Sequence, residues 1–226
     1  MRLLLPLLLV LLQGCPDVSP IEDGRRFGSV VTLQDWFTSC YLLQGSEEVV
    51  LFDSCWREGR LEDALAAHDL TPQQVTHVLL THGHSDHLGG FSLLSEAQLL
   101  AQLGESDNVQ DNSRGSARID QVLSDGQVLL LAGQEIHVLA VPGHSPGSAV
   151  FWVDGALILG DAGLVTGDGA ISTVPEGRSD DPEAAEQMLR GLAARLEERN
   201  LAVDWVVPAH SGALPGLAGL RDFARQ

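Results

Sequence analysis

The stretch THGHSDHLGG at residues 81–90 holds three histidines and one aspartate within six residues, directly after the apolar run HVLL. Side chains two residues apart in an extended chain point the same way, so His82 and His84 can converge. Asp86 and His87 follow in the turn before the glycine pair. Imidazole nitrogen and carboxylate oxygen suit zinc and related first-row ions. The stretch therefore predicts four metal ligands.

Two neighbouring metal ions need roughly six protein ligands, so further histidines or aspartates are expected where other apolar runs end. Three segments fit: VPGH ends at His144, LGD at Asp161 and VPAH at His210. The predicted metal ligands are His82, His84, Asp86, His87, His144, Asp161 and His210. The remaining histidines lack such neighbours and are interpreted as ordinary surface or core residues: His68, His77 and His137.

Such a ligand set predicts hydrolysis. Two divalent ions lower the pKa of a bridging water, so that hydroxide is available near neutral pH, and they polarise a carbonyl or phosphoryl oxygen. No protein nucleophile is needed, and Ser85 is interpreted as a turn residue. Asp86 is the candidate catalytic residue, since it can steer the attacking hydroxide as well as bind metal. Asp53 either orients a ligand histidine or merely ends its strand.

The elements that must position these residues alternate between strands and helices, as in an α/β fold. Helices are expected at 61–70, 182–199 and 217–225. Strands are expected at 27–33, 36–43, 49–53, 75–80, 98–103, 128–131, 136–141, 149–153, 157–159 and 202–207. Residues 104–118 are expected to form a loop that borders the site, and 164–178 part of the pocket wall.

Length and composition indicate one domain with a sizeable core, since the 226 residues are 44% hydrophobic. Thirteen basic residues, all arginine, stand against 31 acidic ones, for a net charge of -18. This balance disfavours binding to a phosphate backbone. We therefore expect a small-molecule substrate and no nucleic-acid partner.

The N-terminus has the pattern of an export signal. Arg2 precedes an apolar run at 3–12, too short to span a bilayer, which needs about 20 residues. The ending LQGC resembles a bacterial lipoprotein cleavage site, which implies a signal peptide at 1–14 and a lipidated Cys15. A tether at 15–26 and the domain at 27–226 would follow, on the extracytoplasmic or periplasmic side of a membrane. An ordinary signal peptide or a misassigned start codon are the alternatives.

Two further cysteines, Cys40 and Cys55, lie on successive predicted strands. Export would permit a disulfide between them. A simple hairpin register, however, places Cys40 nearer Phe52 than Cys55, and a disulfide requires Cα atoms within about 7 Å. Two free thiols are therefore expected.

The series THGHSDH, His144, Asp161 and His210 resembles the metallo-β-lactamase superfamily of metal-dependent hydrolases, and SCYLL and VVLFDSCW resemble two of its strand signatures. The resemblance implies a four-layer αβ/βα sandwich with the metals at one edge between two sheets. It also implies two divalent ions, zinc or alternatively iron or manganese. The first would be held by His82, His84 and His144, the second by Asp86, His87 and His210, with Asp161 bridging them.

Differences from the sequence patterns of known branches of the family reduce the range of possible substrates. THxHxDHxGG and PGHSPGS match glyoxalase II enzymes best, although those carry a C-terminal helical domain and this chain ends 16 residues after His210. True β-lactamases usually have Cys or Ser at the place of Asp161, and lactonases have a tyrosine where this chain has Leu164. We expect a hydrolase of a small ester, thioester or lactone. The alternatives are a phosphodiesterase using the same metal pair and a non-catalytic metal-binding lipoprotein.

Overall fold

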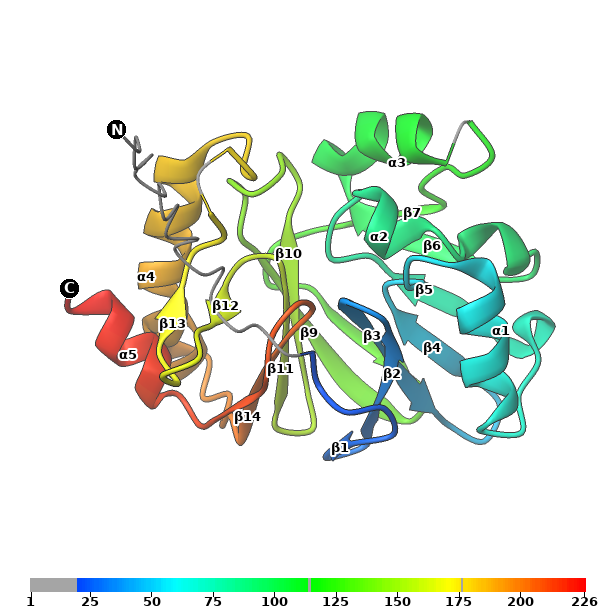
Figure 1. Cartoon of the computed structure of the whole chain (residues 1–226), viewed down its shortest axis with the longest axis horizontal. Coiled ribbons are helices and arrows are strands. Elements are labelled where there is room, and N and C mark those ends of the chain that lie inside the picture. The colour runs from blue at the N-terminus through cyan, green and yellow to red at the C-terminus, as the bar shows by residue number, and fades with distance from the viewer. Residues whose placement is uncertain (1–19, 114, 176) are drawn as a thin grey trace, which may run out of the picture.

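Two mixed β-sheets lie face to face, and helices cover the outer face of each (Figure 1). The computed structural model describes residues 20–113, 115–175 and 177–226. The predicted signal peptide, Cys15 and residues 16–19 lie outside these ranges. No helix in the described part of the chain is long and apolar enough to cross a membrane.

The first sheet has the strand order β1-β2-β3-β4-β5-β6-β7. Strands β1 to β4 pair antiparallel, whereas β4, β5, β6 and β7 run parallel. The strands are β1 (Arg26–Phe27), β2 (Val30–Asp35), β3 (Thr38–Gln44), β4 (Val49–Phe52), β5 (His77–Leu79), β6 (Gln98–Gln102) and β7 (Gln121–Leu123).

The second sheet has the order β15-β14-β11-β10-β9-β8. Its pairs are antiparallel except β11 with β14. The strands are β8 (Val128–Leu131), β9 (Gln134–Ala140), β10 (Ala149–Val153), β11 (Ala156–Gly160), β14 (Trp205–Pro208) and β15 (Leu214–Pro215). A separate small hairpin joins β12 (Leu164–Val165) to β13 (Ile171–Ser172).

Helices α1 (Glu58–Ala66), α2 (Ser85–Leu88) and α3 (Ser106–Asn112) lie outside the first sheet, and α4 (Pro182–Glu198) and α5 (Ala218–Ala224) outside the second (Figure 1). Short 3₁₀ turns occupy Pro72–Gln74, Phe91–Leu93 and Leu103–Glu105. The Asp181 side chain caps α4 by accepting a hydrogen bond from the Ala184 amide, with Pro182 in the first turn.

The core consists of three apolar clusters, one between each pair of adjacent layers. Successive strand residues point to opposite faces. Thus Leu51 of β4 joins the cluster under α1, whereas Phe52 packs between the sheets against Phe151. Leu157 and Leu189 pack between the second sheet and α4. Three clusters between four layers confirm the expected αβ/βα sandwich.

Two segment predictions are wrong. The expected loop at 104–118 contains a 3₁₀ turn and helix α3, because Val109 is buried in the core and anchors this polar segment. The tether prediction for residues 15–26 is wrong in the part that the structure describes, because Ile21 is 2% exposed and packs between the sheets.

The direction of the strands determines where the candidate functional residues lie. The carboxyl ends of parallel strands meet at one edge of a sheet, and ligands bind outside such ends. In the first sheet Asp53, Thr81 and Leu103 follow shortly after β4, β5 and β6. In the second sheet β9 and β11 both pair antiparallel with β10, so they run the same way, and β14 runs parallel to β11. The loops after β4, β5, β9, β11 and β14 carry the residues that the sequence predicts for the site.

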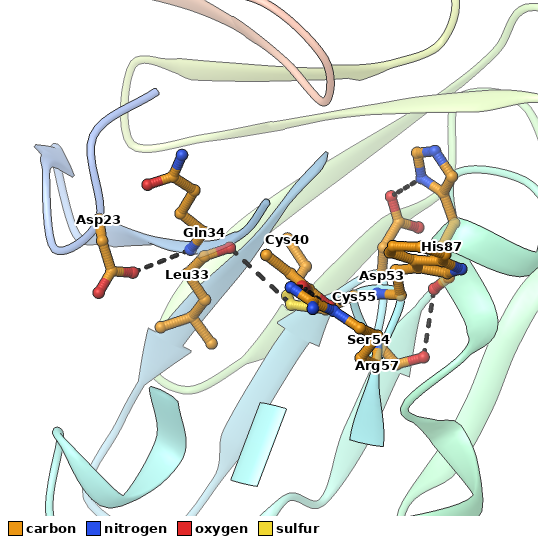
Figure 2. The surroundings of a disulfide bond; sticks show 11 residues. Asp23, Leu33, Gln34, Cys40, Asp53, Ser54, Cys55, Arg57 and His87 are labelled. Carbon is orange, nitrogen blue, oxygen red and sulfur yellow. Dashed lines mark hydrogen bonds and ion pairs between the residues drawn. A yellow bond between two sulfur atoms is a disulfide. The ribbon is translucent and has the colours of Figure 1, made fainter. Parts of the chain in front are cut away.

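Cys40 and Cys55 form a disulfide, so the prediction of free thiols is wrong (Figure 2). Tyr41 does pair with Phe52, as a simple register requires. Beyond Phe52, however, Asp53 and Cys55 adopt left-handed conformations with φ of 61° and 57°. These two bends turn the chain back, and the Cα atoms of the two cysteines lie 5.1 Å apart.

The disulfide is testable by counting thiols in a Cys15→Ala chain. We expect no titratable thiol after unfolding without reductant, and two after reduction. The further change of Cys40 and Cys55 to alanine removes a cross-link across a separation of 15 residues. It should lower the free energy of unfolding by about 3 kcal/mol in urea titrations followed by tryptophan fluorescence. Two thiols in the unfolded, unreduced chain would contradict the bridge.

Candidate metal centre

The first group of donors contains three imidazoles, those of His82, His84 and His144. His82 Nε2 lies 3.0 Å from His84 Nδ1, and His144 Nε2 lies 3.2 Å and 3.1 Å from these two atoms. Zinc–nitrogen bonds of about 2.0–2.1 Å in a tetrahedron place the nitrogens roughly 3.3 Å apart. The three nitrogens therefore face one point at the spacing that a tetrahedral ion requires.

The second group contains Asp86, His87 and His210. His210 Nε2 lies 3.2 Å from Asp86 Oδ2 and 3.3 Å from His87 Nε2. The Nδ1 atom of His210 is 2.9 Å from the Phe37 carbonyl oxygen, which fixes the ring with Nε2 toward the group. Such a contact to a ligand histidine is the usual way in which a protein sets its orientation.

Asp161 lies between the two groups. Its Oδ2 atom is 3.6 Å from His144 Nε2, and its Oδ1 atom is 3.2 Å from His210 Nε2 and 3.4 Å from His87 Nε2. Oδ1 is buried, yet its contacts lack hydrogen-bond geometry. A buried carboxylate oxygen without such a partner is costly unless a cation satisfies it. The donor set thus fits two cations with Asp161 between them.

Charges in the cluster shift pKa values in opposite directions. Burial lowers the pKa of His82 well below its usual range, and His87 lowers it further. Burial would also lower the pKa of His87, but Asp161 and Asp53 raise it well above the usual range. Asp161 likewise outweighs burial and raises the pKa of His210 to about 10. The carboxylates thus create a negative potential that favours positive charge, whether carried by protons or by metal ions.

All seven predicted ligands meet in this centre, and two of the contrasting histidines have ordinary partners elsewhere. His77 Nδ1 contacts the Thr76 hydroxyl at 2.9 Å. The His137 ring packs against Trp152 with centroids 5.3 Å apart. The distinction drawn from sequence neighbours therefore agrees with the geometry.

Asp53 orients a histidine of the second group, which decides between the two interpretations of this residue. Its Oδ2 atom is 2.8 Å from His87 Nδ1 and accepts a hydrogen bond from the Thr81 hydroxyl at 2.8 Å, while its Oδ1 atom accepts one from the Thr81 amide at 2.7 Å. The Ser54 hydroxyl donates to the His87 carbonyl at 3.2 Å (Figure 2). The Ser54 amide donates to the same carbonyl at 2.7 Å. The chain after β4 therefore holds both the ring and the backbone of His87.

Sequence reasoning missed Glu105, which performs the matching task for the first group. This fully buried carboxylate accepts hydrogen bonds from the Gly83 amide (2.7 Å), the Gly147 amide (2.7 Å), the Ser145 hydroxyl (2.5 Å) and Asn108 Nδ2 (3.0 Å). Gly83 lies between His82 and His84, and Ser145 follows His144. Glu105 thus ties together the two loops that carry the first group. Its only sequence signal was its position shortly after a strand.

Tyr41 and Ser211 support the second group in a similar way. The Tyr41 hydroxyl donates to the Pro208 carbonyl at 2.5 Å, and burial, with Asp53 and Asp161, raises its pKa well above the usual value. The buried Ser211 hydroxyl accepts from the Val165 amide at 2.8 Å. The segment that carries His210 is therefore fixed on both sides.

Gly160, the residue before Asp161, brings the two sheets into contact. Its φ is 53°, and a Cβ there would lie 2.6 Å from Thr81 Oγ1. Only glycine fits both this left-handed conformation and the close approach. Asp161 can therefore reach donors from both sheets.

A cleft of about 870 Å³ opens over the donors, a size that suits a small molecule. Its lining combines five of the metal-ligand candidates with apolar and polar residues of the surrounding loops. The lining residues are Phe37, His84, Ser85, Asp86, Asn112, His144, Asp161, Leu164, Val174, Pro175, Gly177, Arg178, Ser179, Asp180 and His210.

We expect Glu105→Gln to weaken the affinity of the first donor group for zinc about tenfold. An amide nitrogen in place of one oxygen would face a backbone N–H and leave a buried donor unpaired, at a cost of about 1–3 kcal/mol. Competition with a chromophoric chelator measures this, and Glu135→Gln, an exposed glutamate of β9, is the matched control. Unchanged affinity for both ions in Glu105→Gln would show that the carboxylate does not position these ligands.

Comparison with known proteins agrees with the geometry. The family model described as the metallo-beta-lactamase superfamily matches residues 33–210. A hydroxyacylglutathione hydrolase of Anaeromyxobacter dehalogenans is 32% identical over 198 residues, covering 88% of this chain and 68% of that protein. A metallo-beta-lactamase domain-containing protein 1 of Xenopus laevis is also 32% identical, over 76% of this chain and 70% of its own.

Solved structures share the fold. A metallo-beta-lactamase family protein from Thermus thermophilus superposes with a TM-score of 0.63 at 25% identity, covering 87% of this chain and 77% of its own. A metallo-beta-lactamase from Pontibacter korlensis superposes with a TM-score of 0.71 at 18% identity, covering 91% and 97%, which supports the fold alone. From the family match, the relatives and the shared fold, this chain belongs to the metallo-β-lactamase superfamily.

Proposed function

We propose that this protein is a dinuclear metal-dependent hydrolase that cleaves a small ester, thioester or lactone. The observation that carries the proposal is the position of Asp161 between two groups of donors that open into one cleft. His82, His84 and His144 would hold one ion and Asp86, His87 and His210 the other. Zinc suits this nitrogen-rich set, with iron or manganese as alternatives.

Bound divalent ions supply an acidified water and a Lewis acid for the scissile carbonyl. The side chains of the protein orient the reacting groups and exclude bulk water. Burial would raise the pKa of Asp86, but its 3.2 Å contact with His210 lowers it, so the carboxylate stays ionised at neutral pH. Asp86 also lines the cleft, where it can accept a hydrogen bond from the attacking water and direct it. This is the catalytic role that we assign to it.

Acyl substrates are favoured over phosphodiesters by two observations. Relatives at about one-third identity are named hydroxyacylglutathione hydrolases. The chain also carries a net charge of -18, which opposes binding of a polyanion such as nucleic acid. The solved metallo-beta-lactamases below 25% identity support the fold and do not bear on the substrate.

We expect Asp161→Ala to reduce the metal content from about two ions per chain to one or fewer. Hydrolysis should fall about 100-fold or more, as when one electrostatic group of an active site is removed. Mass spectrometry of reconstituted protein and a panel of thioester, lactone and bis-nitrophenyl phosphate substrates measure both. His137→Ala, which lies outside the cluster, should match the wild type. Cleavage of the phosphate ester alone would replace the proposal with a phosphodiesterase, and metal binding without turnover would replace it with a metal-binding protein.

We also propose that the protein is exported and anchored to a membrane through a lipid on Cys15. The sequence pattern of residues 1–15, which resembles a lipoprotein signal, supports this proposal, and so does the disulfide, because disulfides persist in oxidising compartments outside the cytoplasm. Cys15→Ala should move the protein from the membrane to the soluble fraction after cell lysis in a bacterial host. Globomycin should leave the uncleaved precursor. An unchanged distribution under both treatments would exclude lipid anchoring at this residue.

A further inference from the structure

We propose that Trp36, Phe37 and Trp56, here termed the aromatic platform, form a subsite that binds an apolar, preferably aromatic, group of the substrate next to the scissile bond. The inference rests on the proposed hydrolytic function and extends it to a class of substrate. It starts from the placement of three large aromatic rings beside the metal centre.

The platform lies beside the second donor group. Phe37 lines the cleft together with Asp86 and His210. Its ring stacks on the His210 imidazole, with centroids 5.5 Å apart and an angle of 17° between the planes. Its carbonyl oxygen also contacts His210 Nδ1 at 2.9 Å. A group bound against Phe37 would therefore lie next to the reacting centre.

The three rings form one continuous surface. Trp36 and Trp56 stack with centroids 5.6 Å apart and an angle of 22°, and Phe37 lies 5.3 Å from Trp36 and 5.0 Å from Trp56. Trp36 is 66% exposed and Phe37 is 38% exposed. Scattered apolar side chains are normal on a protein surface, but adjoining exposed aromatic rings beside a polar cleft indicate a ligand surface.

The backbone under the platform is held rigidly. Trp36 and Phe37 form the turn between β2 and β3, and the buried Asp35 carboxylate accepts hydrogen bonds from the Trp56 amide at 3.2 Å and the Arg57 amide at 2.7 Å. The Arg57 guanidinium also pairs with Asp35. The Cys40–Cys55 disulfide fixes the residue before Trp56. Because these residues are already ordered, a ligand does not have to order the rings on binding.

The cleft has a different character beside the first donor group. Ser179 Oγ lies 3.5 Å from His144 Nδ1, and Ser179, Asp180 and the exposed Arg178 line this wall. Val174 and Pro175 of the same segment also line the cleft, so this wall is mixed but carries the charged groups, while Phe37 presents a flat aromatic ring on the side of the second donor group. Such a cleft suits a substrate with one apolar end, and its scissile carbonyl would lie between the two ends.

Two matched series of thioesters test the inference. One compares phenylacetyl with acetyl on the same small thiol, and the other compares an aromatic with a small thiol on the same acetyl group. We expect an effect in at least one of the two series. There, Trp36→Ala and Phe37→Ala should each lower the ratio of kcat/KM for the aromatic thioester to kcat/KM for the small one about tenfold, mainly through KM. The ring partners of Trp36 are Phe37 and Trp56 rather than a candidate ligand, so its variant keeps the test valid if Phe37→Ala disturbs His210.

Leu130→Ala is the matched control, because Leu130 is 73% exposed on β8 and lies outside the cleft. Metal content is measured for each variant. Ratios unchanged in both series would overturn the aromatic subsite while leaving the proposed hydrolysis intact. If the wild type hydrolyses no acyl substrate, the proposed function fails instead.

Binding of phenylacetate and acetate to the metal-loaded protein gives a readout independent of turnover. Two of the four tryptophans belong to the platform, so binding can be followed by their fluorescence. Phenylacetate should bind about tenfold more tightly than acetate to the wild type, and Trp36→Ala should abolish this preference. Equal binding of the two acids by the wild type would overturn the proposal.

Discussion

Five imidazoles and two carboxylates share one corner between the sheets, within a few ångströms of one another. Three of the imidazoles are buried and the other four groups are half-buried, and several face a neighbour with which they cannot all form hydrogen bonds. Burying polar and charged groups in this way is costly unless cations or further hydrogen bonds compensate. The requirement for compensating positive charge is the constraint that organises the surrounding loops.

The fold meets this constraint with one buried carboxylate behind each donor group. Asp53 follows β4 and fixes His87, while Glu105 follows β6 and joins the loops around Gly83 and Ser145. Asp161, carried by the second sheet, lies between the groups because Gly160 allows its strand to approach Thr81 closely. Each candidate ion would therefore be positioned by residues from both sheets, which links the integrity of the sandwich to that of the site.

The disulfide and the aromatic platform occupy the same side of the centre. The segment after β4 carries Asp53, Cys55 and Trp56, so a single turn orients the candidate ligand His87, forms the cross-link and presents an aromatic ring. Left-handed φ angles at Asp53 and Cys55 make this turn possible. We infer that the disulfide supports the geometry of the cleft as well as the stability of the domain.

The amino-acid sequence alone predicts the seven residues that gather in the candidate metal centre and the class of fold. His and Asp at the ends of apolar runs are local features, and strand and helix periodicities follow from residue types. Helix α3 was missed because one buried residue, Val109, decides the position of a polar segment. The Cys40–Cys55 pairing, the hydrogen bonds of Glu105 and the contact of Phe37 with His210 become visible in the folded chain alone. Each of these depends on where the chain returns after a turn, and that is set by packing between distant segments, which no local pattern encodes.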